Sequence, residues 1–128
     1  MLIADNPFEP VIKWSGSKRS VAANLRHLFP RAARYFEPFV GGGAMLPFRP
    51  CRNAAAGDVI DELIELWVCV RDEPDKTASE YRKRWQKLQD EGHWAYYAIR
   101  ASFNRPRNPH AFLSLPRTCV NGFIRCNG

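Results

Sequence analysis

The segment F-E-P-F-V-G-G-G at residues 36–43 constrains the fold of this chain more than any other feature. A short aromatic run over residues 34–39 leads directly into three glycines, and the helix-compatible residues 44–46 follow. Because glycine has no Cβ, such a turn lets backbone N–H groups approach a ligand closely. The segment predicts a strand, a glycine turn and a helix, with a ligand that a side chain at Gly41 or Gly43 would crowd.

Two common phosphate-binding motifs do not fit these glycines. A dinucleotide fingerprint needs a further glycine where Leu46 stands, and a P-loop closes on G-K-S or G-K-T. A lone triple glycine can also form a purely structural turn, because glycine mostly marks backbone freedom. The choice between these interpretations depends on the residues around the turn.

Asp58 is the first candidate partner of the glycine turn. It follows three alanines and Gly57, so we expect a second strand to end near it, before apolar residues recur at helical spacing over residues 60–71. An acidic side chain at the end of such a strand can accept hydrogen bonds from ribose hydroxyls. Asp58 can instead cap the helix that follows, and both roles stay open.

The rest of the chain has a mainly helical pattern. Residues 21–29 predict a short helix closed by Pro30, and residues 74–104 predict two helices separated at Glu91-Gly92. Residues 105–128 predict basic loops around one short helix. The α/β pattern ends near residue 72, so we expect an α/β part over residues 1–72 and a helical and loop part over residues 73–128.

Charge and cysteine usage set broader limits. The 128 residues carry 19 Lys and Arg against 13 Asp and Glu, and the net charge of +6 suits a polyanionic partner without proving one. Four cysteines without a C-x-x-C pair argue against a zinc site and against a dense disulfide framework. No signal peptide is visible, and no stretch approaches about 18 apolar residues. We expect a cytoplasmic protein with free thiols, no metal and no membrane contact.

The segment K-W-S-G-S-K at residues 13–18 places an indole and two ammonium groups around a small turn, which permits carboxylate binding beside aromatic packing. Together with residues 37–43 and Gly57-Asp58, in this order and spacing, it resembles the opening of Dam-type DNA adenine methyltransferases. The resemblance implies an α/β fold, namely a partial Rossmann-like S-adenosylmethionine-dependent methyltransferase fold with a helical DNA-recognition segment. It also implies that S-adenosylmethionine is bound by Trp14, Lys18, Phe39, Gly41, Gly43 and Asp58. In that site Lys18 can pair with the methionine carboxylate and Asp58 with the ribose, while Phe39 and the glycine turn shape the remaining wall.

The C-terminal part of the chain extends the same resemblance. F-N-R-P-R-N-P at residues 103–109 and R-T-C-V-N-G-F-I-R-C-N-G at residues 117–128 look like the family's DNA-recognition region. The implied partner is double-stranded DNA, with phosphate or base-edge contacts from Arg105, Arg107, Arg117, Asn121 and Arg125. Without the resemblance these arginines fit a solvated loop surface. Val120 departs from the pattern, since family members often have an aromatic residue before the Asn-Gly pair.

One family motif is missing from this sequence. The family holds the extruded adenine with Asp-Pro-Pro-Tyr or a close relative, but no two of the ten prolines are adjacent here. We therefore name no catalytic residue. We expect an N-terminal fragment or split half of a site-specific DNA adenine methyltransferase, inactive alone, which a complementary C-terminal chain would complete. The alternative is a non-catalytic DNA-binding module in which the glycine turn is only structural.

Overall fold

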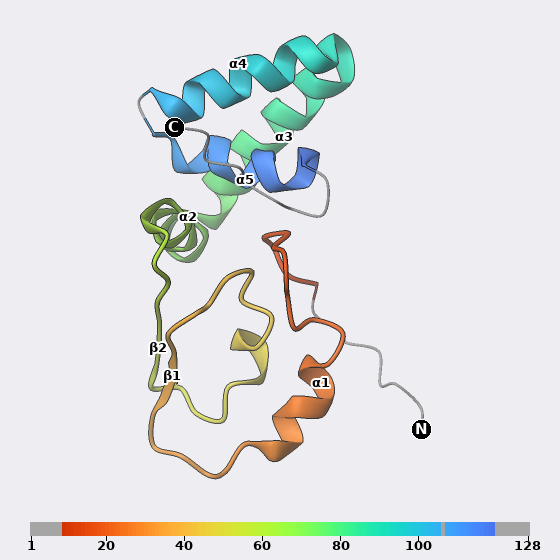
Figure 1. Ribbon diagram of the computed structural model, residues 1–128. Helices are drawn as coiled ribbons and strands as arrows, with labels where there is room; N and C mark the ends of the chain where they lie inside the picture. Colours follow the sequence, from red (N-terminus) through yellow and green to blue (C-terminus); the bar gives the residue numbers. More distant parts are fainter. Residues whose placement is uncertain (1–8, 106, 120–128) are drawn as a thin grey trace. The chain divides into compact units, whose positions relative to one another are not determined.

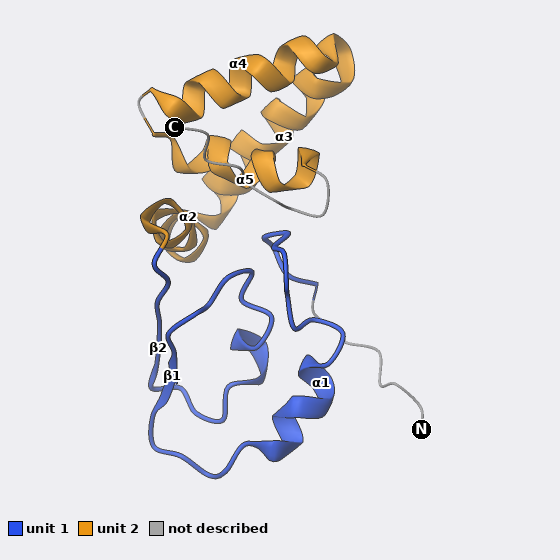
Figure 2. Cartoon of the chain, viewed as in Figure 1, with its two compact units in different colours: residues 1–59 blue, residues 60–128 orange. Residues whose placement is uncertain are grey.

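The computed structural model describes residues 9–105 and 107–119 (Figure 1). The chain divides into two compact units, Met1–Val59 and Ile60–Gly128 (Figure 2). The sequence pattern placed the division near residue 72, one helix later. The reason for the difference is that helix α2 (Asp61–Asp72) packs against the helices that follow it, α3 and α5. The functional division into a cofactor half and a DNA half stays a prediction.

Unit 1 contains a two-stranded parallel sheet. Strand β1 (Tyr35–Glu37) pairs with β2 (Ala54–Ala56), with Phe36 opposite Ala55. β1 is shorter than the segment expected over residues 34–39, and β2 ends two residues before Asp58, although backbone pairing continues past both strands. The N–H of Gly57 donates to the Glu37 carbonyl at 2.8 Å, and the N–H of Val40 donates to the Gly57 carbonyl at 2.9 Å. Parallel pairing therefore brings the two segments that leave the strands to the same edge of the sheet.

The buried core of unit 1 is formed by residues outside the two strands, although Phe29, packed against it, contacts Tyr35 of β1 with ring centres 5.7 Å apart. Helix α1 (Ala22–Leu25) continues as the 3-10 turn η1 (Arg26–Leu28), close to the helix expected over residues 21–29. The helix expected at residues 44–46 is wrong: a 3-10 turn, η2 (Leu46–Phe48), forms instead, because Pro47 lacks an N–H and Pro50 follows soon after. The buried cluster joins α1 to η2 and comprises Ala22, Ala23, Met45 and Phe48, with Leu25 and Phe29 packed against it.

The sheet itself is largely uncovered. Phe36, in the middle of β1, is 67% exposed, and all three residues of β2 are exposed. Parallel sheets usually have both faces covered, because their crossover connections place helices there. The two strands therefore hold backbone segments in register and contribute little to the apolar core.

Unit 2 consists of helices, as the apolar spacing predicted. α3 (Pro74–Glu91) and α4 (His93–Asn104) follow α2 and meet at Gly92, where φ is 61° and the backbone N–H donates to the Leu88 carbonyl at 3.0 Å. α5 (Pro109–Thr118) packs against α2, α3 and α4. It is the central helix of the unit, and its residues 111–116 are all buried.

The sequence before α5 explains where that helix begins. Asn108 is the N-cap, and its side-chain oxygen accepts hydrogen bonds from the N–H groups of His110 at 2.9 Å and Ala111 at 3.4 Å. Pro109 occupies the first helical position, where its missing N–H has no intrahelical partner to lose. This local signal fixes the start of the one short helix expected in the basic region, which proves to be ten residues long.

Two broader expectations can be compared with the structure. Cys51, Cys69 and Cys119 are free thiols, whereas Cys126 lies outside the described residues. Among the helices that the structure describes, none is both long and apolar enough to cross a membrane.

Candidate functional site

The glycine turn follows directly from the sheet of unit 1. Val40 is buried and is paired with Gly57, and its carbonyl accepts a hydrogen bond from the Gly43 N–H at 2.8 Å. Gly41 and Gly43 have φ angles of 48° and 68°, in the left-handed region that side chains disfavour. The chain therefore turns sharply at the carboxyl end of β1, where ligands of open α/β sheets bind.

Close packing against Trp14 is a second reason for the glycines. A Cβ at Gly41 would lie 2.8 Å from the indole Cδ1 of Trp14, and a Cβ at Gly42 would lie 2.7 Å from the carbonyl oxygen of Ile12. From the sequence, crowding at Gly41 was expected to come from a ligand. In the structure the nearest atoms belong to Trp14, so this glycine is required by the packing of residues 12–14 on the turn.

Asp58 connects the turn to the second strand. Its Oδ2 accepts a hydrogen bond from the Gly41 N–H at 3.0 Å. The N-cap of α2 is Ile60, so Asp58 is not the N-cap of that helix, and the capping interpretation is wrong in that form. Three segments that are far apart in the sequence, around Trp14, Gly41 and Asp58, thus meet within unit 1.

Two further residues of the expected site are open to solvent. Phe39, next to the turn, is 81% exposed. Lys18 is exposed at the start of the α1 region, and its carbonyl accepts a hydrogen bond from the Val21 N–H at 3.0 Å. Between Trp14 and Lys18 the chain turns at Gly16, where φ is 72°, and the Ser17 N–H donates to the Trp14 carbonyl at 3.3 Å. The side chains of Phe39 and Lys18 are therefore accessible to a ligand.

A tyrosine–glutamate pair occupies one face of β1. The Tyr35 hydroxyl donates to Glu37 Oε2 at 3.1 Å. Burial, followed by the adjacent negative charge and this hydrogen bond, raises the pKa of Tyr35 to about 12. Burial also raises the pKa of Glu37, against the lowering effect of the Tyr35 hydrogen bond. The pair favours a protonated tyrosine and fixes side chains on the strand that leads into the glycine turn.

The arginines expected to contact DNA have separate partners in unit 2. Arg105 is the exposed C-cap residue of α4, and its N–H donates to the Ala101 carbonyl at 3.1 Å. Arg107 forms an ion pair with Glu62 on α2. Arg117 lies at the end of α5 with its guanidinium carbon 5.2 Å from the centre of the Tyr81 ring. The other two expected contacts, Asn121 and Arg125, lie outside the described residues, as does Val120.

Several residues that organise these positions were not predicted from the sequence. Ile12 and Gly42 set the approach of the first segment to the glycine turn, and Glu62 and Tyr81 hold Arg107 and Arg117. Tyr81 also stacks on Trp85, with ring centres 6.3 Å apart and planes inclined by 22°. The four-residue spacing of Tyr81 and Trp85 was a visible helical signal, whereas their partner on α5 was not.

The sequence of residues 14–128 matches the family described as D12 class N6 adenine-specific DNA methyltransferase. The chain belongs to this family. It is 27% identical over 140 residues to the type II methyltransferase M.MjaIII of Methanocaldococcus jannaschii, covering 93% of this chain and 48% of that protein. It is 30% identical over 122 residues to the DNA N-6-adenine-methyltransferase of Escherichia phage P1, covering 91% of this chain and 16% of that protein.

A third relative of the same kind is the DNA adenine methylase of Vibrio cholerae, 29% identical over 120 residues that cover 91% of this chain and 43% of the relative. The chain spans less than half the length of each of these three curated relatives. The expected Dam-type family is confirmed, and the mixture of helices with a short parallel sheet is consistent with a methyltransferase-type fold of this D12 class.

Proposed function

We propose that this chain is the cofactor-binding and DNA-contacting part of a DNA adenine methyltransferase, which transfers a methyl group from S-adenosylmethionine to the adenine amino nitrogen. The hydrogen bond from Gly41 N–H to Asp58 Oδ2 carries the proposal, because it joins the two motifs to which the family resemblance assigns the nucleoside of the cofactor. The family match and the names of the relatives support the reaction. The finer description, a partial Rossmann-like fold with a helical DNA-recognition segment, belongs to the same proposal.

The residues of unit 1 fit S-adenosylmethionine by their chemistry. Asp58 offers a carboxylate acceptor for ribose hydroxyls beside a turn whose glycines leave the backbone open to a ligand. Phe39 offers an exposed aromatic face for a flat base, and Lys18 offers an exposed ammonium for the methionine carboxylate. Trp14 acts by packing on Gly41, which holds the turn in place. When bound, the cofactor supplies the electrophilic methyl group.

DNA contact is assigned to Arg105, Arg107 and Arg117, together with Asn121 and Arg125. Among the described arginines, Arg117 is held over the Tyr81 ring, with its guanidinium carbon 5.2 Å from the ring centre. Phosphate oxygens and guanine edges are bound by the N–H edge of the same group, so stacking and DNA contact are compatible. We propose that the partner is double-stranded DNA and that the protein is cytoplasmic.

We further propose that transfer requires an Asp-Pro-Pro-Tyr-type motif from outside these 128 residues, and a complementary C-terminal chain is one way to supply it. These 128 residues contain no such motif. The exposed Phe36 face and the uncovered β2 support a partner that packs on the sheet, since parallel sheets are normally covered. A chain of this kind would also supply the strands that satisfy the remaining sheet edges.

Isothermal titration with S-adenosylmethionine and S-adenosylhomocysteine, alongside a methyl-transfer assay on adenine-containing duplex DNA, tests the proposal. We expect saturable binding of both ligands and no transfer by the chain alone. Failure to bind either ligand would contradict the cofactor assignment and favour the alternative, a non-catalytic DNA-binding module. That alternative predicts DNA affinity that falls steeply with salt and is indifferent to the cofactor.

A further inference from the structure

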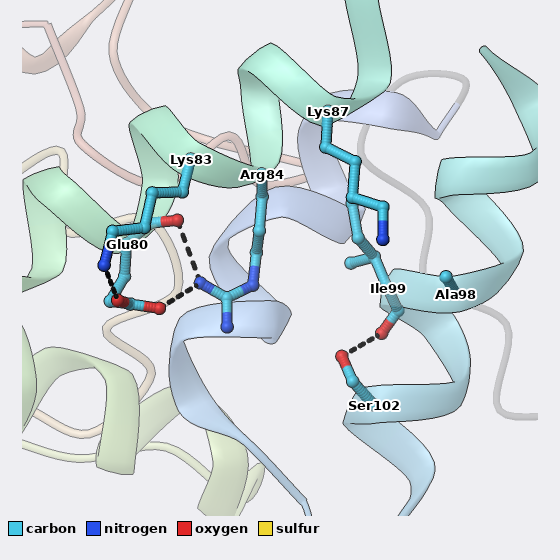
Figure 3. A pocket seen from close by; sticks show the side chains of 7 residues that line it. All are labelled: Glu80, Lys83, Arg84, Lys87, Ala98, Ile99 and Ser102. Atoms are coloured by element: carbon cyan, nitrogen blue, oxygen red, sulfur yellow. Dashed lines mark hydrogen bonds and ion pairs between the residues drawn. The ribbon is translucent and has the colours of Figure 1, made fainter. Parts of the chain in front are cut away.

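A basic groove lies between α3 and α4, and its lining includes none of the described arginines that the sequence motifs single out. Its volume is about 290 Å³. Figure 3 shows Lys83, Arg84 and Lys87 projecting from α3, with the Lys87 side chain directed toward Ile99 of α4. We call this site the α3–α4 groove, and its lining comprises Glu80, Lys83, Arg84 and Lys87 from α3, and Ala98, Ile99 and Ser102 from α4.

Glu80 organises the cations on the α3 wall. Its carboxylate accepts from Lys83 at 2.9 Å and from Arg84 at 2.8 Å, and its backbone carbonyl accepts a second bond from Arg84 at 2.9 Å. These hydrogen bonds lower the pKa of Glu80 to about 2, so it is ionised at neutral pH. The Arg84 side chain is only 15% exposed and is held against the wall.

The two lysines are different, because they reach solvent at the mouth of the groove. The side chains of Lys83 and Lys87 are 70% and 47% exposed. Lys87 lies 3.8 Å from Glu91, a long and solvent-exposed ion pair of the kind that contributes little to stability. Both ammonium groups can therefore exchange a protein carboxylate for a phosphate at small energetic cost.

The geometry points to duplex DNA phosphates as the ligand of the α3–α4 groove, with Lys83 and Lys87 as the contacting residues. Three cations outnumber Glu80 within the lining, and they still outnumber the carboxylates when Glu91 at the rim is counted. Lys83 and Lys87 are one turn apart, about 6 Å along the helix axis. Phosphates of one strand recur about every 3.4 Å along the duplex axis, so alternate phosphates are about 6.8 Å apart, close to the lysine spacing.

This inference rests on the proposed DNA partner and extends the contact surface beyond the Arg-rich segments to a face of α3. In the competing interpretation, this face of α3 is a solvent-exposed surface with ion pairs and no ligand. That interpretation predicts no loss of DNA affinity when the lysines are neutralised.

Salt-dependent binding of a short fluorescein-labelled DNA duplex to the full chain, followed by anisotropy, tests the groove. The slope of log affinity against log salt is negative. In the Lys83→Gln/Lys87→Gln variant it should become less steep by about 1.8, that is, by about 0.9 for each phosphate that a lysine no longer neutralises. Arg82→Gln is the control, because Arg82 is exposed on α3 but does not line the groove. An unchanged slope in the double variant, or an equal effect per charge in Arg82→Gln, would overturn the inference.

A second pair of variants adds charge instead of removing it. Ala98→Glu places a carboxylate in the groove, whereas Ala101→Glu places the same charge on an exposed residue of α4 outside it. We expect Ala98→Glu to weaken DNA binding several-fold more than Ala101→Glu, and equal effects would overturn the groove as a site. If the unmodified chain binds no duplex at low salt, the proposed DNA partner fails as well. If it binds while both groove variants behave like their controls, only the groove fails.

Discussion

The two units arrange their candidate functional residues in contrasting ways. In unit 1 three short segments converge through backbone contacts: the Gly41 N–H reaches Asp58, and Gly41 and Gly42 admit Trp14. In unit 2 regular helices carry the basic residues, and side chains such as Glu80 and Tyr81 hold them individually. Substitutions in unit 1 should therefore affect both the stability of the fold and the binding of the cofactor. Substitutions of single residues in unit 2 should each change the affinity for DNA by a small amount.

The largest expected effect is at the glycine turn. Gly42→Ala forces a Cβ to within 2.7 Å of the Ile12 carbonyl oxygen, so we expect a loss of about 1–3 kcal/mol in the free energy of unfolding. Gly57→Ala is the matched control, because a Cβ there meets nothing within 4 Å. Urea denaturation of both variants makes the comparison. Equal stabilities would show that the close approach of residue 12 to the turn does not exist in solution.

Asp58 should give an effect of similar size, on ligand binding more than on the stability of the fold. Asp58→Asn removes a charged acceptor for ribose, and a hydrogen bond to a charged group is worth about 1.5–3 kcal/mol, or roughly 10- to 150-fold in affinity. Asp61→Asn, three residues along and exposed in the first turn of α2, carries the same change of charge. Calorimetric titration with S-adenosylhomocysteine should separate the two. An equal decrease in both variants would assign the effect to net charge.

We expect His110 to make the stability of unit 2 depend on pH. Its Nδ1 is buried and has no hydrogen-bond partner among the residues described. Burial lowers the pKa of His110, the positive charges of Arg84 and Lys76 lower it further, and Glu80 and Glu73 oppose them. Because the folded state disfavours protonation, stability is full above the ordinary histidine pKa and is lost as pH falls below it.

The variant His110→Gln should therefore have a flatter dependence of melting temperature on pH between about 7 and 5 than the unmodified chain. His93→Gln, which changes an exposed histidine at the start of α4, should retain the original slope. Thermal unfolding followed by circular dichroism measures both. A slope that His110→Gln leaves intact would mean that another group governs the acid sensitivity.

The smallest predicted effect concerns the support of Arg117. Tyr81→Leu keeps an apolar side chain but removes the ring beneath the guanidinium, a contact worth about 0.5–1 kcal/mol. DNA affinity should fall by roughly two- to five-fold. Tyr97→Leu, at an exposed tyrosine on α4, is the control. Identical anisotropy curves for Tyr81→Leu and the unmodified chain would show that Arg117 needs no such support.

The contrast between the units also explains what the sequence could predict. The helices of unit 2 follow local apolar spacing and local signals such as Gly92 and Asn108-Pro109, so their bounds were close to expectation. In unit 1 the residues of the candidate site were proposed from motifs, and their contacts could not be predicted. The approach of Trp14 to Gly41 and the hydrogen bond between Gly41 and Asp58 depend on chain folding over long sequence separations. No periodicity encodes such contacts.

The differences between expectation and structure have equally specific causes. The helix expected after the glycines became a 3-10 turn because Pro47 removes a donor, which the helical interpretation of residues 44–46 did not consider. The compact units divide after Val59 and not near residue 72, because α2 packs against α5. This packing depends on contacts between residues far apart in the sequence. Arg117 was identified by resemblance, whereas its partner Tyr81 lies on another helix and could be found only from the structure.

The most direct test of the central claim is an assigned ¹H–¹⁵N correlation spectrum of the chain during titration with S-adenosylhomocysteine. The claim is that Gly41 and Asp58, joined at 3.0 Å, form the cofactor site. We predict that the amide resonances of Gly41, Gly43 and Asp58 shift saturably with one dissociation constant. They should shift at lower ligand concentrations than any resonances in α3 and α4. Saturable shifts confined to unit 2, or no shift at Gly41 when the ligand is in excess, would contradict the account.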